Sequence, residues 1–150
     1  MNFQEFETRL EEVRASRAGA AGEFALFESV IATSADLERV EAELRVSLPA
    51  VYKDFLRRLG GGSFLFLDLL PAVAPDDSDE DLLTVNTGEW KIPDFIAIAP
   101  VGTGDWWGFR VAHENRCSDA VYLWSHDDGE LIPESADFLD FVAAKGLSKD

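Results

Sequence analysis

The sequence has few of the residues on which metal and cofactor sites usually depend. It contains one cysteine and two histidines. A single thiol, Cys117, excludes both an intramolecular disulfide and a cysteine metal cluster. The group His126-Asp127-Asp128 lies in a predicted turn and lacks the three or four rigid ligands of a zinc site. We therefore expect no metal site and no cofactor.

Basic residues are also scarce, with 13 Lys and Arg against 29 Asp and Glu and a net charge of −16. Such a chain repels phosphate backbones and anionic lipid surfaces, and it attracts basic proteins. The small basic group Lys53, Arg57 and Arg58 is interpreted as the solvated outer face of one helix. We expect no binding to nucleic acid or membrane, and a basic protein as partner.

Long apolar runs are missing. The most apolar stretch, residues 64–73, carries Asp68 and Pro71 and is shorter than the roughly 20 residues that a membrane-spanning helix needs. The charged N-terminal residues 1–16 lack the apolar region of a secretion signal, so we expect a cytoplasmic protein. The 47% hydrophobic content of the 150 residues suits one core, and we predict a single domain, 1–150, with 1–32 as a helical extension.

Apolar residues recur at helical spacing in the first half of the chain. This predicts helices at 3–14, 35–45 and 49–59, whereas 23–31 favours an extended segment over a helical turn. Either Thr33 or Ser34 can cap the second helix, with Asp36 in its first turn. Pro49 suits the first position of the third helix, and Gly60-Gly61-Gly62 ends it.

The pattern changes after these glycines to short β-rich segments bounded by turn residues. The predicted strands are 64–70, 82–87, 95–99, 106–111, 120–124 and 130–132. Ser135 can cap a last helix. The fold class is therefore α+β, with an antiparallel or mixed sheet of about five to six strands, N-terminal helices on one face and a closing C-terminal helix.

Two acidic clusters and a tryptophan pair are the candidate partner-binding residues. Acidity can serve solubility alone, but these acids are clustered. One cluster comprises Asp76, Asp77, Asp79, Glu80 and Asp81, and Asp127 and Asp128 belong to the other. Trp106 and Trp107 are adjacent on a predicted strand, so they should point to opposite faces. The more exposed one is a candidate anchor, unless helices or loops cover both.

Three further positions have predicted structural roles. Glu41 shares a helix face with apolar residues, so its carboxylate needs donors. We expect these to be backbone N–H groups near Pro49 to Tyr52, which would tie two helices together. Gly104, with Gly102, should give a tight loop its conformational freedom before a strand. Gly61 is one of the glycines that should end the third helix.

Catalytic patterns are weak. Serine and histidine occur without a G-x-S-x-G elbow, and Gly60-Gly61-Gly62 ends a helix, whereas a phosphate-binding loop opens one. Paired carboxylates are unavoidable in so acidic a chain and indicate little. We expect the protein not to be an enzyme.

Five segments in order resemble the SUKH superfamily. They are ADLERVEAEL, VSLPAVYKDFLRRLGGG, FIAIAPVGTGDWWGFRV, AVYLWSHDDGE and SADFLDFVAA, together covering roughly residues 33–144. That superfamily includes fungal cell-wall synthesis regulators and bacterial proteins that confer immunity to polymorphic toxins. The resemblance implies a sheet packed against helices, a protein-binding role and no catalytic residues. It leaves two functions open, an immunity protein that binds a cognate toxin and a regulatory or scaffold adaptor without one.

Overall fold

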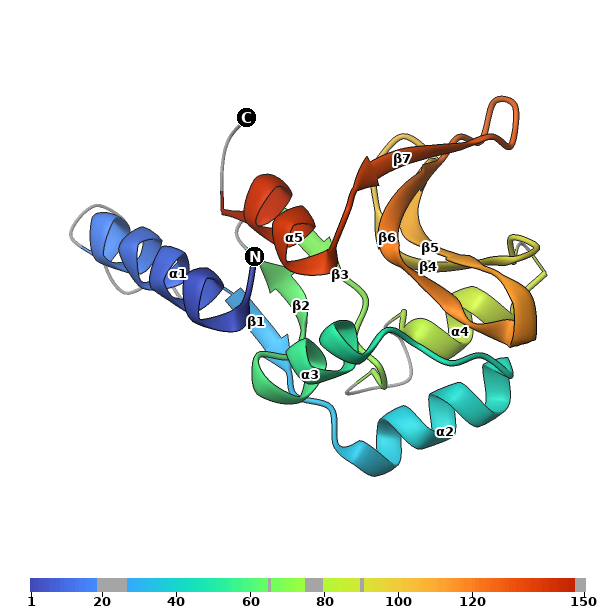
Figure 1. Ribbon diagram of the computed structural model, residues 1–150, viewed down its shortest axis with the longest axis horizontal. Coiled ribbons are helices and arrows are strands. Elements are labelled where there is room, and N and C mark those ends of the chain that lie inside the picture. Colours follow the sequence, from blue (N-terminus) through green and yellow to red (C-terminus); the bar gives the residue numbers. More distant parts are fainter. Residues whose placement is uncertain (19–26, 65, 75–79, 90, 148–150) are drawn as a thin grey trace.

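The protein is described by a computed structural model that covers residues 1–18, 27–64, 66–74, 80–89 and 91–147 (Figure 1). Helices and strands both contribute, which confirms the α+β class. The helices are α1 (Phe3–Ala18), α2 (Ser34–Leu44), α3 (Ala50–Arg58), α4 (Leu82–Thr87) and α5 (Phe138–Gly146). The strands are β1 (Phe27–Val30), β2 (Gly61–Phe64), β3 (Leu67–Leu69), β4 (Phe95–Pro100), β5 (Trp106–Val111), β6 (Cys117–Trp124) and β7 (Leu131–Ser135).

Side-chain caps determine where two helices begin. The Thr33 side chain accepts a hydrogen bond from Asp36 N at 3.0 Å, and the Asp36 carboxylate accepts one from Thr33 N at 3.0 Å. This capping box satisfies two N–H groups at the start of α2, and of the two cap candidates in the sequence Thr33 is the one used. Helix α5 differs from the expectation, because its cap is Asp137 instead of Ser135.

The strands form two antiparallel sheets, one in the order β1-β2-β3 and one in the order β4-β5-β6-β7. The sheets are joined just beyond β3, where Leu70 N donates a hydrogen bond to Ile98 O of β4 at 2.8 Å. Strand β2 begins at Gly61, earlier than the glycine-rich sequence indicated. A Cβ at Gly61 would lie 2.6 Å from Leu70 O, so only glycine lets the chain cross here.

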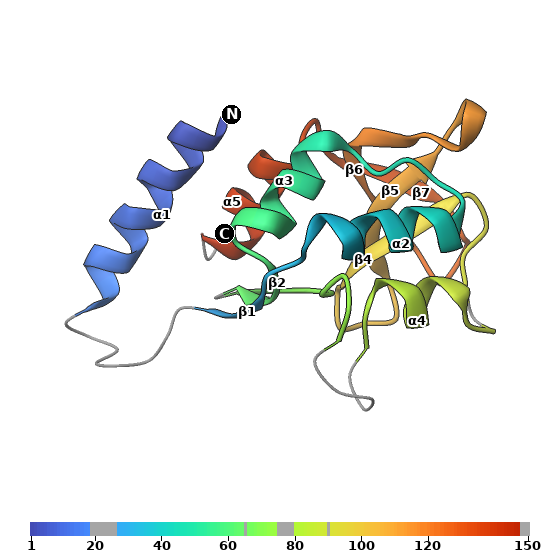
Figure 2. The same cartoon turned by 90° about the horizontal axis from the view of Figure 1, so that it is seen from below.

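Residues 82–87 are helical, and the prediction of a strand there was wrong. Asp81 caps the segment, accepting a hydrogen bond from Thr84 N at 2.8 Å while Thr84 Oγ1 accepts one from Asp81 N at 2.9 Å. The cap outweighs the β propensity of the segment. Helix α4 packs against α2 and against β4 (Figure 2).

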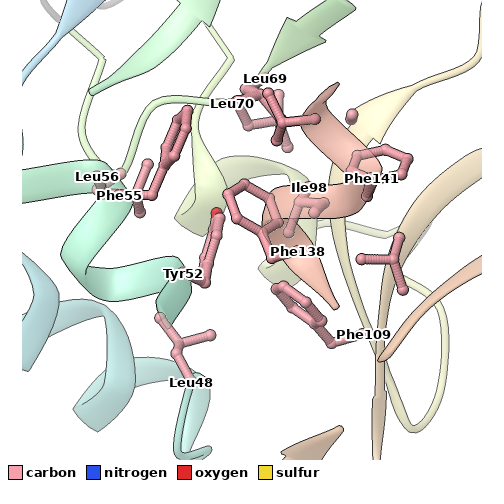
Figure 3. Packing of buried hydrophobic residues seen from close by; sticks show 14 of the residues in the cluster. Leu48, Tyr52, Phe55, Leu56, Leu69, Leu70, Ile98, Phe109, Phe138 and Phe141 are labelled. Carbon is pink, nitrogen blue, oxygen red and sulfur yellow. The ribbon is translucent and has the colours of Figure 1, made fainter. Parts of the chain in front are cut away.

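Aromatic side chains from α3, β5 and α5 fill the centre of the core (Figure 3). The Tyr52 ring packs edge-on against Phe109 and Phe138, with centroids 5.0 and 4.9 Å away. Phe55 packs edge-on against Phe138 at 5.0 Å. Helix α5 contacts elements of both sheets as well as α1 and α3. It therefore connects the parts of the fold that the sequence places far apart.

Candidate protein-binding surface

Trp106 and Trp107 lie on opposite faces of β5, and both are half-buried. Trp107 faces α5 and β7, where its indole N–H donates a hydrogen bond to Glu134 Oε1 at 2.8 Å. Its ring packs edge-on against Phe141 at 5.4 Å, and Lys145 Nζ lies 5.7 Å from its centroid. Trp107 therefore helps to hold α5 against the sheet.

Trp106 faces the other way, toward α4. It lines a hollow of about 290 Å³ together with residues on and around α4, among them Glu80, Glu89 and Val85. Of the two tryptophans, Trp106 thus borders open space, whereas the ring of Trp107 is enclosed by α5 and β7. This makes Trp106 the better candidate for a partner anchor.

The acidic run at 76–81 divides into parts with different roles. Asp76, Asp77 and Asp79 lie outside the described residues. Glu80 is exposed. Asp81 is 8% exposed, and besides capping α4 its carboxylate accepts a hydrogen bond from Ala74 N at 3.0 Å. A buried carboxylate that is hydrogen-bonded in this way stabilises the fold and is not presented to a partner.

Asp127 and Asp128 lie exposed at the tip of the β6–β7 hairpin. Asp128 accepts a hydrogen bond from Glu130 N at 2.9 Å, which is a local turn contact. The base of the turn is tied to the β4–β5 loop, because the Asp105 carboxylate accepts hydrogen bonds from His126 N at 2.9 Å and from His126 Nδ1. The hairpin acids are thereby held at a fixed position on the surface.

Gly104 lies against this contact. Its φ is +102°, and a Cβ there would lie 3.3 Å from the His126 ring. The predicted conformational role of Gly104 therefore agrees with its backbone, and the absence of a side chain also gives the imidazole room. The sequence did not indicate the contact between Asp105 and His126, which are 21 residues apart.

The Asp105–His126 pair predicts a pH dependence of stability. The side-chain hydrogen bond between His126 and Asp105 raises the pKa of His126 above the ordinary value of 6.5. The hydrogen bonds from the His126 backbone and ring lower the pKa of Asp105 below 3.8. The contribution of His126 to the free energy of unfolding is complete below pH 6.5 and is lost as the pH rises through its raised pKa. The contribution of Asp105 is lost as the pH falls through its lowered pKa.

We therefore expect the difference in melting temperature between the wild type and His126→Gln to be largest near pH ~5 and to shrink above pH ~7. The matched control is His113→Gln, because His113 is the second histidine of the sequence and is exposed like His126. Thermal melts across this pH range measure both differences. A difference for His126→Gln that does not vary with pH would contradict the assignment.

Glu41 ties α2 to the start of α3, close to where the sequence predicts. Its Oε2 accepts a hydrogen bond from Leu48 N at 2.8 Å, so the donor lies one residue before the expected range. Lys53 Nζ is 3.3 Å from the same oxygen. Lys53 is therefore a partner of Glu41 and not part of the solvated face. Pro49 is buried and occupies the N-cap position of α3, one position before the first helical residue, without a side-chain capping hydrogen bond.

Replacing Glu41 by glutamine should lower the free energy of unfolding by roughly 1 kcal/mol, since the charge on a half-buried hydrogen bond is lost while one acceptor remains. Glu43→Gln is the control, because Glu43 is exposed and pairs only with Arg39 among the described residues, 3.3 Å away on the same helix. Its effect should be a few tenths of a kcal/mol, roughly. Equal losses in urea denaturation would show that Glu41 does not tie the helices.

Two properties of the described titratable side chains concern metal binding and thiol reactivity. Among the described residues, no three of the His, Cys, Asp and Glu side chains are grouped so as to hold a metal ion. Burial raises the pKa of the Cys117 thiol to about 12, so it is protonated and unreactive at neutral pH.

Within the described ranges, no helix has the length and hydrophobicity needed to cross a membrane.

Two structural residues went unrecognised in the sequence. Asn86 is 7% exposed, and its amide forms hydrogen bonds to both backbone polar groups of Ala97 in β4. Gly108 lies inside β5, where a Cβ would lie 2.1 Å from Ile96 O. The glycine within a strand was an available signal. Asn86 gave none, because its role depends on α4.

A family model described as SUKH_6, SMI1-KNR4 cell-wall, matches residues 34–142. The chain belongs to this SUKH family. The match spans the elements from α2 to α5, with Glu41, Asn86, Trp106 and the hairpin acids inside it. The SUKH family includes toxin-immunity proteins, its members typically bind proteins, and they are generally non-catalytic. No curated protein matches the SUKH chain.

Proposed function

We propose that this SUKH protein is a cytoplasmic immunity protein that neutralises a cognate polymorphic toxin by binding it directly. Membership of the family, which includes toxin-immunity proteins, is the observation that carries the proposal. The net charge of −16 indicates which kind of surface the partner should have. A toxin with a basic surface, for example a nuclease, is complementary to this field.

The acidic clusters support a mechanism in which carboxylates meet the toxin where it would otherwise bind phosphate. Glu80, Asp127 and Asp128 are exposed, and the sequence places Asp76, Asp77 and Asp79 directly before Glu80. These charges would mainly raise the rate of encounter. Contacts with an aromatic anchor such as Trp106 would then set the lifetime of the complex.

Co-expression tests the proposal. The candidate toxin domain is the one encoded beside this chain, expressed from an inducible promoter in a host that it kills. We expect growth to be restored by the wild-type chain. The negative control is the same host carrying the toxin plasmid together with an empty vector. Failure of the wild type to restore growth, at protein levels that a blot verifies, would contradict the immunity role.

A regulatory or scaffold adaptor is the second candidate, and the cell-wall description of the matching family model favours it. It needs the same folded acidic surface but no toxin. If the adaptor role is correct, deletion of the gene should alter growth or morphology in a strain that lacks every candidate toxin. An immunity protein should be dispensable in that strain.

A further inference from the structure

We propose that the hollow beside Trp106 receives an arginine side chain from the basic protein partner. The inference rests on the proposed protein-binding function and adds a site and its ligand chemistry. The hollow lies between α4 and β5 and has a volume of about 290 Å³. This is slightly below the range of roughly 300–1,000 Å³ that small-molecule sites occupy, and it suits a single long side chain.

The larger part of the hollow's wall is apolar. Trp106 supplies an indole from β5, and Val85 and Ile92 supply aliphatic side chains, all three being half-buried. In the described part of the chain, no cation or second ring stacks on Trp106, in contrast to Trp107. A tryptophan face that is partly desolvated and not already stacked attracts cations, arginine most often.

Two carboxylates complete the site. Glu80 lies just before the cap of α4 and Glu89 just after its C-terminal Gly88, so one acid stands beyond each end of the helix. Both are exposed, and neither forms an ion pair or hydrogen bond with another described residue. Their charges are therefore not neutralised by a cation from the described part of the protein itself.

Arginine fits this combination better than lysine. Its planar guanidinium can stack on an indole through its face while its edge donates hydrogen bonds to carboxylates. Its methylene groups can cover the aliphatic wall at Val85 and Ile92. A lysine ammonium is more strongly hydrated and loses more on leaving water. The geometry thus selects a side chain with an apolar stem and a flat cationic end.

The probe is a capped pentapeptide with a central arginine between glycines, titrated into the full chain and followed by the indole N–H resonances. Trp106→Phe assigns the Trp106 resonance. We expect the arginine peptide to shift it, while a citrulline peptide, uncharged and of the same shape, leaves it in place. Equal shifts with citrulline would overturn the proposal, and equal shifts with lysine would overturn the choice of arginine.

The double variant Glu80→Gln/Glu89→Gln should bind the arginine peptide roughly tenfold more weakly. Both residues are exposed, so the fold should be retained. The matched control is Glu5→Gln/Glu12→Gln, which removes the same charge from exposed positions on α1. It should leave binding nearly unchanged. Equal weakening by both double variants would attribute the binding to overall charge and overturn the site.

Co-expression separates this inference from the proposed function. Growth restored by the wild type but reduced with Glu80→Gln/Glu89→Gln supports the hollow as the toxin contact. Full rescue by both chains overturns this contact and leaves the immunity role intact. Absence of rescue by the wild type contradicts the immunity role, and the peptide titration then decides on the arginine site by itself.

Discussion

Replacing Asn86 by alanine should lower the free energy of unfolding by roughly 2–4 kcal/mol. The Asn86 side chain accepts a hydrogen bond from Ala97 N at 2.8 Å and donates to Ala97 O at 3.0 Å and to Leu82 O at 2.9 Å. All of these groups are buried. The Asn86 amide makes the hydrogen bonds to β4 that a neighbouring strand would otherwise make. Alanine would leave both polar groups of Ala97 without partners, which costs about 1–3 kcal/mol for each.

The control is Gln4→Ala, which removes an amide from an exposed position on α1 and should change stability by less than about 0.5 kcal/mol. Urea denaturation measures both values. Asn86→Asp keeps an acceptor for Ala97 N but no donor, so it should also be destabilising. An Asn86→Ala protein as stable as the control would show that α4 is not attached to β4 through this amide.

Gly108→Ala should cost about 3 kcal/mol or more, because the strand is already closely packed at this position. A Cβ would lie 2.1 Å from Ile96 O and 2.6 Å from an atom of the Phe95 ring. The ring can rotate, but the carbonyl belongs to the paired strand β4 and can move only with the sheet. We expect a melting temperature lower by roughly 6–12 °C, since each kcal/mol is about 2–4 °C in a domain of this size.

Gly102→Ala separates crowding from backbone strain. Gly102 has a φ of +102°, and a Cβ added there would have no neighbouring atom within 4 Å. Alanine at this position therefore introduces strain alone, about 1 kcal/mol. Gly108→Ala should be clearly the more destabilising of the two in calorimetry. Equal losses would mean that β4 and β5 can separate to accommodate a methyl group.

The sequence predicts the elements whose signals are local. A cap for α2 at Thr33 or Ser34, and the strands on either side of the loop 102–105, follow from residues close together in the chain. The 82–87 segment was misassigned because its valine and threonines favour a strand. The Asp81–Thr84 cap that makes it helical lacks the usual sequence signature, because Thr84 stands where a capping box normally has Glu or Gln.

Local sequence signals also predict only part of the candidate binding surface. The position of Glu41 on an apolar face was sufficient to predict a backbone donor near the start of α3. By contrast, Asp81 cannot be distinguished from its acidic neighbours in the sequence, although it is buried as a helix cap. The hollow beside Trp106 depends on α4 packing against β4 next to Trp106, so no run of residues indicates it.

The charge of the surface has a kinetic consequence that can be measured without knowing the contacts. Salt screens exposed charges over about 10 Å at 0.1 M, so an association steered by carboxylates slows as salt is added. Neutralising the acidic run while keeping the Asp81 cap gives the variant Asp76→Asn/Asp77→Asn/Asp79→Asn/Glu80→Gln. Asp81 stays unchanged because its loss would remove the cap of α4.

The association rate of the purified chain with the neighbouring toxin domain, measured by stopped flow over a range of salt concentrations, tests the central claim most directly. The claim predicts a complex whose formation is fast at low salt and slows steeply as salt rises. The four-residue variant should associate more slowly and with a flatter salt dependence. No complex, or a rate that is independent of salt in the wild type, would contradict it.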